Sequence, residues 1–275
     1  MRILLPLLTL FVFSACDTHS REKTVTLNGF DYSHKKITEL QPELNEISGI
    51  AYDRNKHCFL AINDEQGILF ALNPSDFTIQ QQLKFGKKGD YECVATNGTT
   101  VFVLKSNGDV YAMNFADSLS QITVSSYPGP TTEFESCIWD DEKKVLKLVS
   151  KKSAADKEIQ ANNIYNFNPE HGAYVVDNTS RISWDHLKKA GLSSKAFHPS
   201  GAATEPSTGN IYVVASIEKS LVIFKSDWTV LSVHQLDEAV FPQPEGITFD
   251  KDGNLLITNE AAGAKPTLVF IPVKK

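Results

Sequence analysis

The chain has 275 residues, a formal net charge of −6 and a pI near 5.7. This acidic balance provides no electrostatic footprint for nucleic acid, so no nucleic-acid partner is expected. The length suffices for one closed β-domain with a substantial core.

The first 15 residues have the pattern of a secretory signal peptide. Arg2 supplies the early positive charge, and the apolar run from Ile3 to Phe13 is too short to span a bilayer. The run ends in Phe-Ser-Ala-Cys, which resembles a bacterial lipobox, where Cys16 becomes the acylated first residue. We therefore expect an exported protein, anchored by lipid at Cys16 to a membrane of the bacterial cell envelope, with residues 16–35 as a flexible tether. The alternative is an ordinary signal peptide with an incidental cysteine.

One short phrase occurs five times in the rest of the chain. Each copy begins with Glu or Ser, continues with a small residue and apolar residues, and in most copies ends at Asp or Asn. The starting positions lie 44, 43, 65 and 45 residues apart, and such a period with several short strands per unit is typical of a β-propeller. The copies are SGIAYD from Ser48, ECVATN from Glu92, ESCIWD from Glu135, SGAATE from Ser200 and EGITFD from Glu245.

Four short strands are predicted in each repeat. In the first repeat these are ISGIAYD, CFLAIND, ILFALN and TIQQQLKF, separated by turn-forming residues. The third repeat is longer, and SWDHLKKAG within it predicts a short helical insertion near residues 183–194, with Ser183 as N-cap and Gly191 as its stop.

The fifth repeat contains only three predicted strands before the chain ends. We expect the segment KKITELQP, just before the first phrase, to supply the fourth strand, because an open ring would leave a sheet edge exposed. Residues 36–275 are thus predicted to form a single all-β domain, a five-bladed β-propeller closed by its N-terminal strand.

The phrases, read in order, resemble a known family. SGIAYD, YECVA, FESCIWD, PSGAAT and QPEGITFD behind a lipoprotein signal are similar to the SdiA-regulated family of bacterial proteins, distant relatives of the NHL-repeat propellers. The resemblance extends from about Ile37 to Val273. It implies a five-bladed β-propeller with a bound calcium ion, and it implies no particular activity. The chain departs from the family pattern at Cys93 and at Ser136-Cys137, which bear on packing rather than on the carboxylates.

The first position of the phrase places three glutamates, Glu92, Glu135 and Glu245, at equivalent points of the predicted propeller. Because the first strand of each blade lines the central channel, these carboxylates converge and repel one another if they are left unpaired. Carboxylate and hydroxyl oxygens at this density suit Ca²⁺. We therefore predict a calcium site there, with Ser48 and Ser200 as possible direct or water-mediated partners.

Residues at the end of the second strand are candidates for a further layer of this site. Asp64 in the first blade and Glu260 in the fifth lie in neighbouring blades of a closed ring, and they are predicted as second-layer or water-mediated ligands. Ordinary polar rim residues are the alternative. The channel glutamates also have alternatives to a metal: they could accept backbone hydrogen bonds, or Lys105 or Lys151 could pair with them.

The remaining cysteines and a segment similar to a calcium loop are predicted to have structural rather than chemical roles. Three cysteines remain besides Cys16, an odd number that does not provide a complete disulfide framework. Cys93 and Cys137 are therefore expected to pack as small buried hydrophobes. The segment DKDGN from Asp250 imitates the start of a calcium loop but lacks the distal glutamate, so it is interpreted as a hairpin turn.

These features favour a binding or scaffold module. It would be a lipid-anchored calcium propeller, expected to be monomeric, that presents a rim of loops to an envelope protein or a small-molecule ligand. No nucleophile elbow, phosphate loop or dinucleotide fingerprint occurs. The alternative is a calcium-dependent hydrolase of lactone or phosphoester type, in which the metal polarises a carbonyl or activates water. Its candidate general bases are Glu65, Glu260 and His198.

Overall fold

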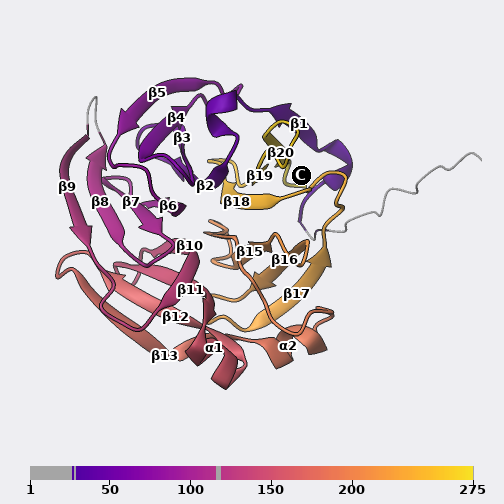
Figure 1. Ribbon diagram of the computed structural model, residues 1–275. Helices are drawn as coiled ribbons and strands as arrows, with labels where there is room; N and C mark the ends of the chain where they lie inside the picture. The colour runs from indigo at the N-terminus through magenta and orange to yellow at the C-terminus, as the bar shows by residue number, and fades with distance from the viewer. Residues whose placement is uncertain (1–26, 28, 116–118, 275) are drawn as a thin grey trace, which may run out of the picture.

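The strands of the protein form a ring of five sheets around a central axis (Figure 1). The computed structural model describes residue 27, residues 29–115 and residues 119–274. Over these residues each sheet consists of four antiparallel strands, which is the arrangement of a five-bladed β-propeller. The fold predicted from the repeat is confirmed.

Each of the first four blades takes four consecutive strands, with the innermost strand first in the sequence (Figure 1). The fifth blade combines the last three strands with the first one. By blade, the strands are β2 (Ile47–Asp53), β3 (Cys58–Asn63), β4 (Ile68–Leu72) and β5 (Ile79–Lys84); β6 (Tyr91–Thr96), β7 (Thr100–Lys105), β8 (Val110–Phe115) and β9 (Leu119–Ser125); β10 (Thr132–Asp140), β11 (Val145–Ser153), β12 (Ala161–Asn168) and β13 (Ala173–Ser183); β14 (Gly201–Thr204), β15 (Ile211–Ala215), β16 (Ser220–Phe224) and β17 (Val230–Gln235); and β18 (Pro244–Phe249), β19 (Leu255–Asn259), β20 (Thr267–Ile271) and β1 (Lys36–Glu39).

Strand β1 closes the ring, as the sequence predicted. It pairs antiparallel with β20, and the register places Lys36 opposite Phe270 and Glu39 opposite Thr267. Figure 1 shows the indigo β1 beside the yellow β20. The pairing covers an edge of the C-terminal sheet that would otherwise be open to other strands.

The hydrophobic core of the described residues is divided into five clusters, each packed between two neighbouring blades. For example, Leu60 of the first blade and Val103 of the second lie in one cluster, and neither is exposed. Because both faces of each blade are covered in this way, the second strands are apolar on both sides, and β3 and β15 are buried along their whole length. This explains why these strands are continuous apolar runs instead of alternating ones.

Two short helices accompany the third blade: one lies between its strands β11 and β12, and the other follows its last strand, β13. Helix α2 (Trp184–Lys189) confirms the predicted insertion: the Ser183 hydroxyl accepts a hydrogen bond from the His186 N–H, and Gly191 follows the helix with a φ of +111°. Helix α1 (Ala154–Ile159) was not predicted. It begins at Ser153, whose hydroxyl accepts from the Asp156 N–H at 3.0 Å, an S-x-x-D capping pattern readable in the sequence. Two 3₁₀ turns, η1 (Tyr32–His34) and η2 (Pro42–Leu44), flank β1.

The packed part of the chain begins before residue 36. Leu27 and Phe30 are buried in the cluster between the fourth and fifth blades, and the Asp31 N–H donates to the carbonyl of Pro272 at 2.8 Å. The expected signal peptide (residues 1–15) and Cys16 lie outside the described residues. In the part of the chain that is described, no helix is long and apolar enough to cross a membrane.

Candidate metal and ligand site in the central channel

Three sets of equivalent positions, one residue from each blade, supply most of the side chains of the candidate site. The first set is the first position of the repeated phrase, and the second lies two residues before it. The third directly follows the second strand of the blade, except in the third blade, where it lies near the end of the longer β11. The sets are Ser48, Glu92, Glu135, Ser200 and Glu245; Glu46, Asp90, Glu133, His198 and Gln243; and Asp64, Ser106, Lys151, Ser216 and Glu260.

Most of these residues line a cavity of about 450 Å³ to which all five blades contribute; Ser48, Asp90, Ser106 and Glu133 are the members of the sets that do not line it. Carboxylates outnumber cations in its wall, where only Lys151, Lys219 and His198 can carry positive charge. The cavity therefore favours a cation as an occupant. The carboxylates are Glu46, Asp64, Glu92, Glu135, Glu245 and Glu260.

The three glutamates of the phrase all line this cavity, but their surroundings differ. Glu135 is buried and ion-paired with Lys151, which was one of the alternatives to a metal. Burial and the neighbouring Asp90 carboxylate raise the pKa of Glu92 to about 9. Burial raises the pKa of Glu245 to about 7, although a hydrogen bond from Ser216 and the charge of Lys151 oppose the shift. In the absence of a metal, Glu92 is thus protonated at neutral pH.

The two serines of the phrase connect neighbouring blades. The Ser48 hydroxyl donates to the carbonyl of Tyr91 at 2.6 Å, and the Ser200 hydroxyl donates to the carbonyl of Pro244 at 2.7 Å. Each acceptor is the residue just before the phrase glutamate of the next blade, so the serines set the position of Glu92 and Glu245. Their role as water-mediated metal partners stays a prediction.

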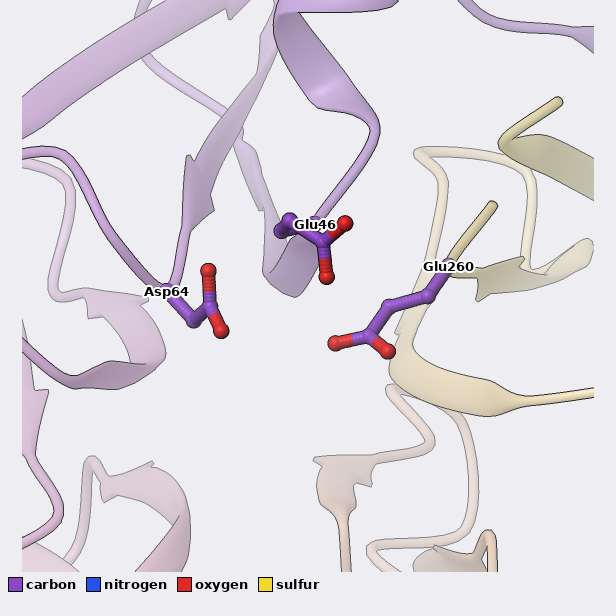
Figure 2. Close-up of side chains that lie close together, drawn as sticks. All are labelled: Glu46, Asp64 and Glu260. Carbon is purple, nitrogen blue, oxygen red and sulfur yellow. The ribbon is translucent and has the colours of Figure 1, made fainter. Parts of the chain in front are cut away.

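A group of three carboxylates at the mouth of the cavity has the spacing that one ion requires. One oxygen from each of Glu46, Asp64 and Glu260 lies within 4.8 Å of the others. Figure 2 shows the three side chains converging from the first and fifth blades. Two ligands on opposite sides of a Ca²⁺ ion, each about 2.4 Å from it, are about 4.8 Å apart, so all three oxygens can reach the same ion. Among the described residues, no other group of three acidic, histidine or cysteine side chains has this spacing.

Backbone hydrogen bonds hold this carboxylate group in place. The Asp64 N–H donates to the carbonyl of Glu46 at 2.9 Å, which keeps these two residues side by side. The Ala261 N–H donates to the carbonyl of Asn45 at 2.8 Å, which fixes the segment after β19 against the first blade. The site is therefore part of the closure between the fifth and first blades.

Burial and mutual repulsion determine the electrostatics of this group. Burial, followed by the charge of Glu46, raises the pKa of Asp64 to about 6. Burial, followed by the charges of Glu245, Glu46 and Asp64, raises the pKa of Glu260 to about 8. The Gln243 amide donates to Glu260, and one carboxylate oxygen of Asp64 is buried without a hydrogen-bond partner in the described residues. Mutual repulsion of this kind is relieved by a divalent ion.

The expectation for Cys93 and Cys137 was wrong. Both are buried, as predicted, but they form a disulfide with a Cα–Cα distance of 5.8 Å that joins the inner strands of the second and third blades. The 44-residue separation equals the repeat period, so the bond links nearly equivalent positions of adjacent blades. Cys58 is free and buried. The odd cysteine count concealed this pair, because the count says nothing about which two residues approach each other.

We expect the Cys93→Ala/Cys137→Ala variant to lose about 2–3 kcal/mol of unfolding free energy, because the unfolded chain regains the freedom of a long loop. Urea unfolding of the oxidised protein measures the change. Cys58→Ala, which removes a buried thiol but no cross-link, is the matched control and should cost clearly less. Equal stability of the two variants would show that the disulfide is dispensable.

The second position of the phrase is small for a steric reason. A Cβ atom on Gly201 would overlap the carbonyl oxygen of Glu245, and one on Gly49 would lie 2.9 Å from the backbone nitrogen of Val94. We therefore expect Gly201→Ala to destabilise the protein by about 2 kcal/mol and to displace Glu245, with a smaller loss for Gly49→Ala. Denaturant unfolding of both variants measures this order, and the reverse order would contradict it.

One residue of the carboxylate group was missed in the sequence. Asp64 and Glu260 were predicted as second-layer residues, whereas Glu46 was not considered. Its position in the sequence could have revealed it: Glu46 lies two residues before the first phrase, at the point equivalent to His198 and Gln243, which also line the cavity.

The segment DKDGN is a hairpin turn, as predicted: Asp250 accepts hydrogen bonds from the N–H groups of Asp252 and Asn254, each at 2.9 Å.

Comparisons with known proteins agree with this architecture. A family model described as SdiA-regulated matches residues 23–263. The structure is similar to the glutaminyl cyclase of Myxococcus xanthus, with a TM-score of 0.60 and 13% identity over 87% of this chain and 96% of that one. It is also similar to the PQQ-bound aldose sugar dehydrogenase of Streptomyces coelicolor, with a TM-score of 0.56 and 10% identity over 87% of this chain and 98% of that one. At these identities the likeness shows the fold alone. No curated protein matches the chain significantly.

Proposed function

The chain belongs to the SdiA-regulated family, and from that premise we propose that it is a calcium-binding propeller whose channel mouth receives a ligand or protein partner. The observation that carries the proposal is the convergence of Glu46, Asp64 and Glu260 on one point. The cavity volume of about 450 Å³ lies within the range of small-molecule sites. Enzymes and binding proteins both use this fold, so the fold by itself favours neither.

The donor set fits Ca²⁺ better than other common ions. The group offers only oxygen atoms, which suit hard cations, and it contains no imidazole or thiolate for zinc. Carboxylates from separate blades and segments adapt more readily to the irregular, long bonds of Ca²⁺ than to the strict octahedron of Mg²⁺. The buried, unpartnered oxygen of Asp64 supports a ligand at this point.

In our proposal the phrase glutamates lie deeper in the cavity than the ion and influence its binding through their charge. Glu135 is compensated by Lys151, whereas Glu92 and Glu245 have raised pKa values, and the charge of Glu245 raises the pKa of Glu260 in the carboxylate group. They remain candidates for direct or water-mediated ligation, as their position in the same cavity allows. Calcium would thus link blades whose inner strands otherwise carry repelling charges.

Calorimetric titration of the purified, chelator-treated protein with CaCl₂ tests the proposal. We expect one strong site, a higher melting temperature with Ca²⁺ than with EDTA, and a much weaker response to Mg²⁺. An unchanged melting temperature together with no heat of binding would refute it.

Lipid anchoring at Cys16 is part of the same proposal, because a tethered propeller would hold its rim at the surface of an envelope membrane. Metabolic labelling with a radioactive fatty acid tests the anchor. Label in the wild type that disappears in Cys16→Ser supports it, and label in neither protein contradicts it.

A further inference from the structure

His198 and Glu218 form a hydrogen-bonded pair in the wall of the channel cavity. His198 lies just before β14, and Glu218 lies in the turn between β15 and β16. The ring Nδ1 is 2.7 Å from one carboxylate oxygen of Glu218, and the backbone N–H of His198 donates to the other at 3.3 Å. Only 3% of the Glu218 side chain is exposed. A buried carboxylate with two contacts to the same residue holds the imidazole in one orientation.

This pairing determines which ring nitrogen is available to the cavity. An ionised carboxylate can only accept hydrogen bonds, so Nδ1 is the nitrogen that carries the proton. In the neutral ring, Nε2 then has the lone pair. Within the described part of the chain Nε2 has no hydrogen-bond partner, and His198 lines the cavity with 27% of its side chain exposed. A histidine that is oriented by a carboxylate through one nitrogen, and free at the other, is arranged as a general base.

A purely structural histidine would not need this geometry. The link to Glu218 through the backbone N–H already fastens the segment before β14. Metal ligation is not required of His198 either, since the three oxygens that share one ion come from other residues. His198 lines the cavity together with Ser216 and Lys219, so its Nε2, which has no hydrogen-bond partner among the described residues, is the feature that needs a chemical role.

The cavity wall also restricts what a substrate can be. Its many carboxylates repel anionic substrates such as phosphate monoesters, so a neutral molecule fits better. Ile217 borders the cavity with 64% of its surface exposed, and it offers apolar contact to a substrate at the rim. The volume of about 450 Å³ lies within the range of small-molecule sites.

We propose that His198 is the catalytic proton acceptor for hydrolysis of a small, uncharged carboxylic ester, open-chain or cyclic, in this cavity; the inference rests on the proposed calcium site. When bound, the cation would polarise the ester carbonyl. His198 Nε2 takes a proton from water while the water oxygen forms a bond to the carbonyl carbon. The carbon–oxygen ester bond then breaks, and the alcohol leaves with the proton that His198 returns. Ester and water are converted to acid and alcohol, with no other reactant. Glu218 is a positioning residue in this scheme.

Hydrolysis of p-nitrophenyl butyrate by the calcium-loaded protein provides the kinetic test. We expect turnover above buffer, a loss of about a hundred-fold or more in kcat for His198→Gln with little change in KM, and an intermediate loss for Glu218→Gln. His171→Gln removes an exposed histidine in the third blade and should leave the rate unchanged. p-Nitrophenyl phosphate, which is anionic, should not be hydrolysed. A wild-type rate equal to buffer, or a His198→Gln rate equal to wild type, would overturn the inference.

The ring of His198 gives a second readout that does not depend on turnover. Long-range ¹H–¹⁵N NMR of the protein should show the neutral His198 ring protonated at Nδ1 and bare at Nε2. Glu218→Gln should disturb this preference, whereas His171→Gln should not. A wild-type ring with its proton on Nε2 would contradict the assignment of the base.

Calorimetry with CaCl₂ separates this inference from the proposed function. His198→Gln should bind Ca²⁺ as the wild type does, because His198 is not in the carboxylate group. Calcium binding without esterase activity would overturn the inference and leave the proposed function standing. Absence of calcium binding in the wild type would overturn the proposed function itself.

Discussion

Replacing Asp64 by asparagine and Glu260 by glutamine together is expected to lower the affinity for Ca²⁺ about a hundred-fold or more. Both changes keep the size of the side chain and remove its charge, and the affinity of calcium sites depends strongly on the number of charged ligands. A hundred-fold loss corresponds to about 2.8 kcal/mol of binding free energy. Calorimetric titration of the double variant, and its melting temperature with and without Ca²⁺, measure the effect.

The same double variant should be more stable than the wild type when no metal is present. Removing two of the three converging carboxylates relieves the repulsion that raises the pKa values of Asp64 and Glu260. Asp252→Asn is the matched control, because Asp252 is exposed in the DKDGN hairpin and paired with Lys251. If that control lost calcium binding and the double variant kept it, the hairpin would be the site and our assignment would be wrong.

Raising the pH is expected to destabilise the metal-free protein by roughly 2 kcal/mol per pH unit between pH 6 and 8.5. The cause is the raised pKa of Glu92, to about 9, and of Glu260, to about 8, against an ordinary value of 4.5. In this window the folded protein keeps protons that the unfolded chain has released. Because the folded state binds more protons, its unfolding free energy falls as the pH rises and levels off above the folded pKa values.

Denaturant unfolding in EDTA at pH 6, 7.25 and 8.5 measures this dependence. Glu92→Gln imitates the protonated side chain and should flatten the curve, whereas Glu39→Gln, on the exposed strand β1, should not. Calcium reverses the trend: its affinity should increase with pH because binding displaces these protons. A metal-free stability that rises over this range would contradict the raised pKa values.

Several parts of the fold were readable from local patterns. The repeated phrase predicted five blades, because a period of this length with turn residues between short apolar runs leaves few other architectures. The missing strand of the last repeat predicted the pairing of β1 with β20, since a sheet edge needs a partner. Ser183 and Gly191 marked α2 through capping, a local interaction. Helix α1 carried the same kind of signal at Ser153 and was overlooked.

Only part of the candidate site could be predicted from the sequence, and the reason is physical. Sequence equivalence predicted Glu92, Glu135 and Glu245 in one cavity, but it left open whether a metal, backbone groups or a lysine compensates them, and Lys151 neutralises one of them. The closest convergence of oxygens involves Glu46, which depends on a backbone bond between its carbonyl and the Asp64 N–H across the blade. Such contacts are set by strand register and by the loops between strands, which single-residue patterns do not specify.

The sequence by itself determined the number of blades, the closing strand, the small residue at the second position of the phrase and the ring of acidic positions, because these follow from periodicity and from local chemistry. The tertiary structure alone decided which partners those positions acquire: Cys93 with Cys137, His198 with Glu218, and Asp64 with Glu46 and Glu260. Each of these joins residues from different strands, segments or blades, and their distance depends on how the blades pack against one another rather than on their spacing along the chain.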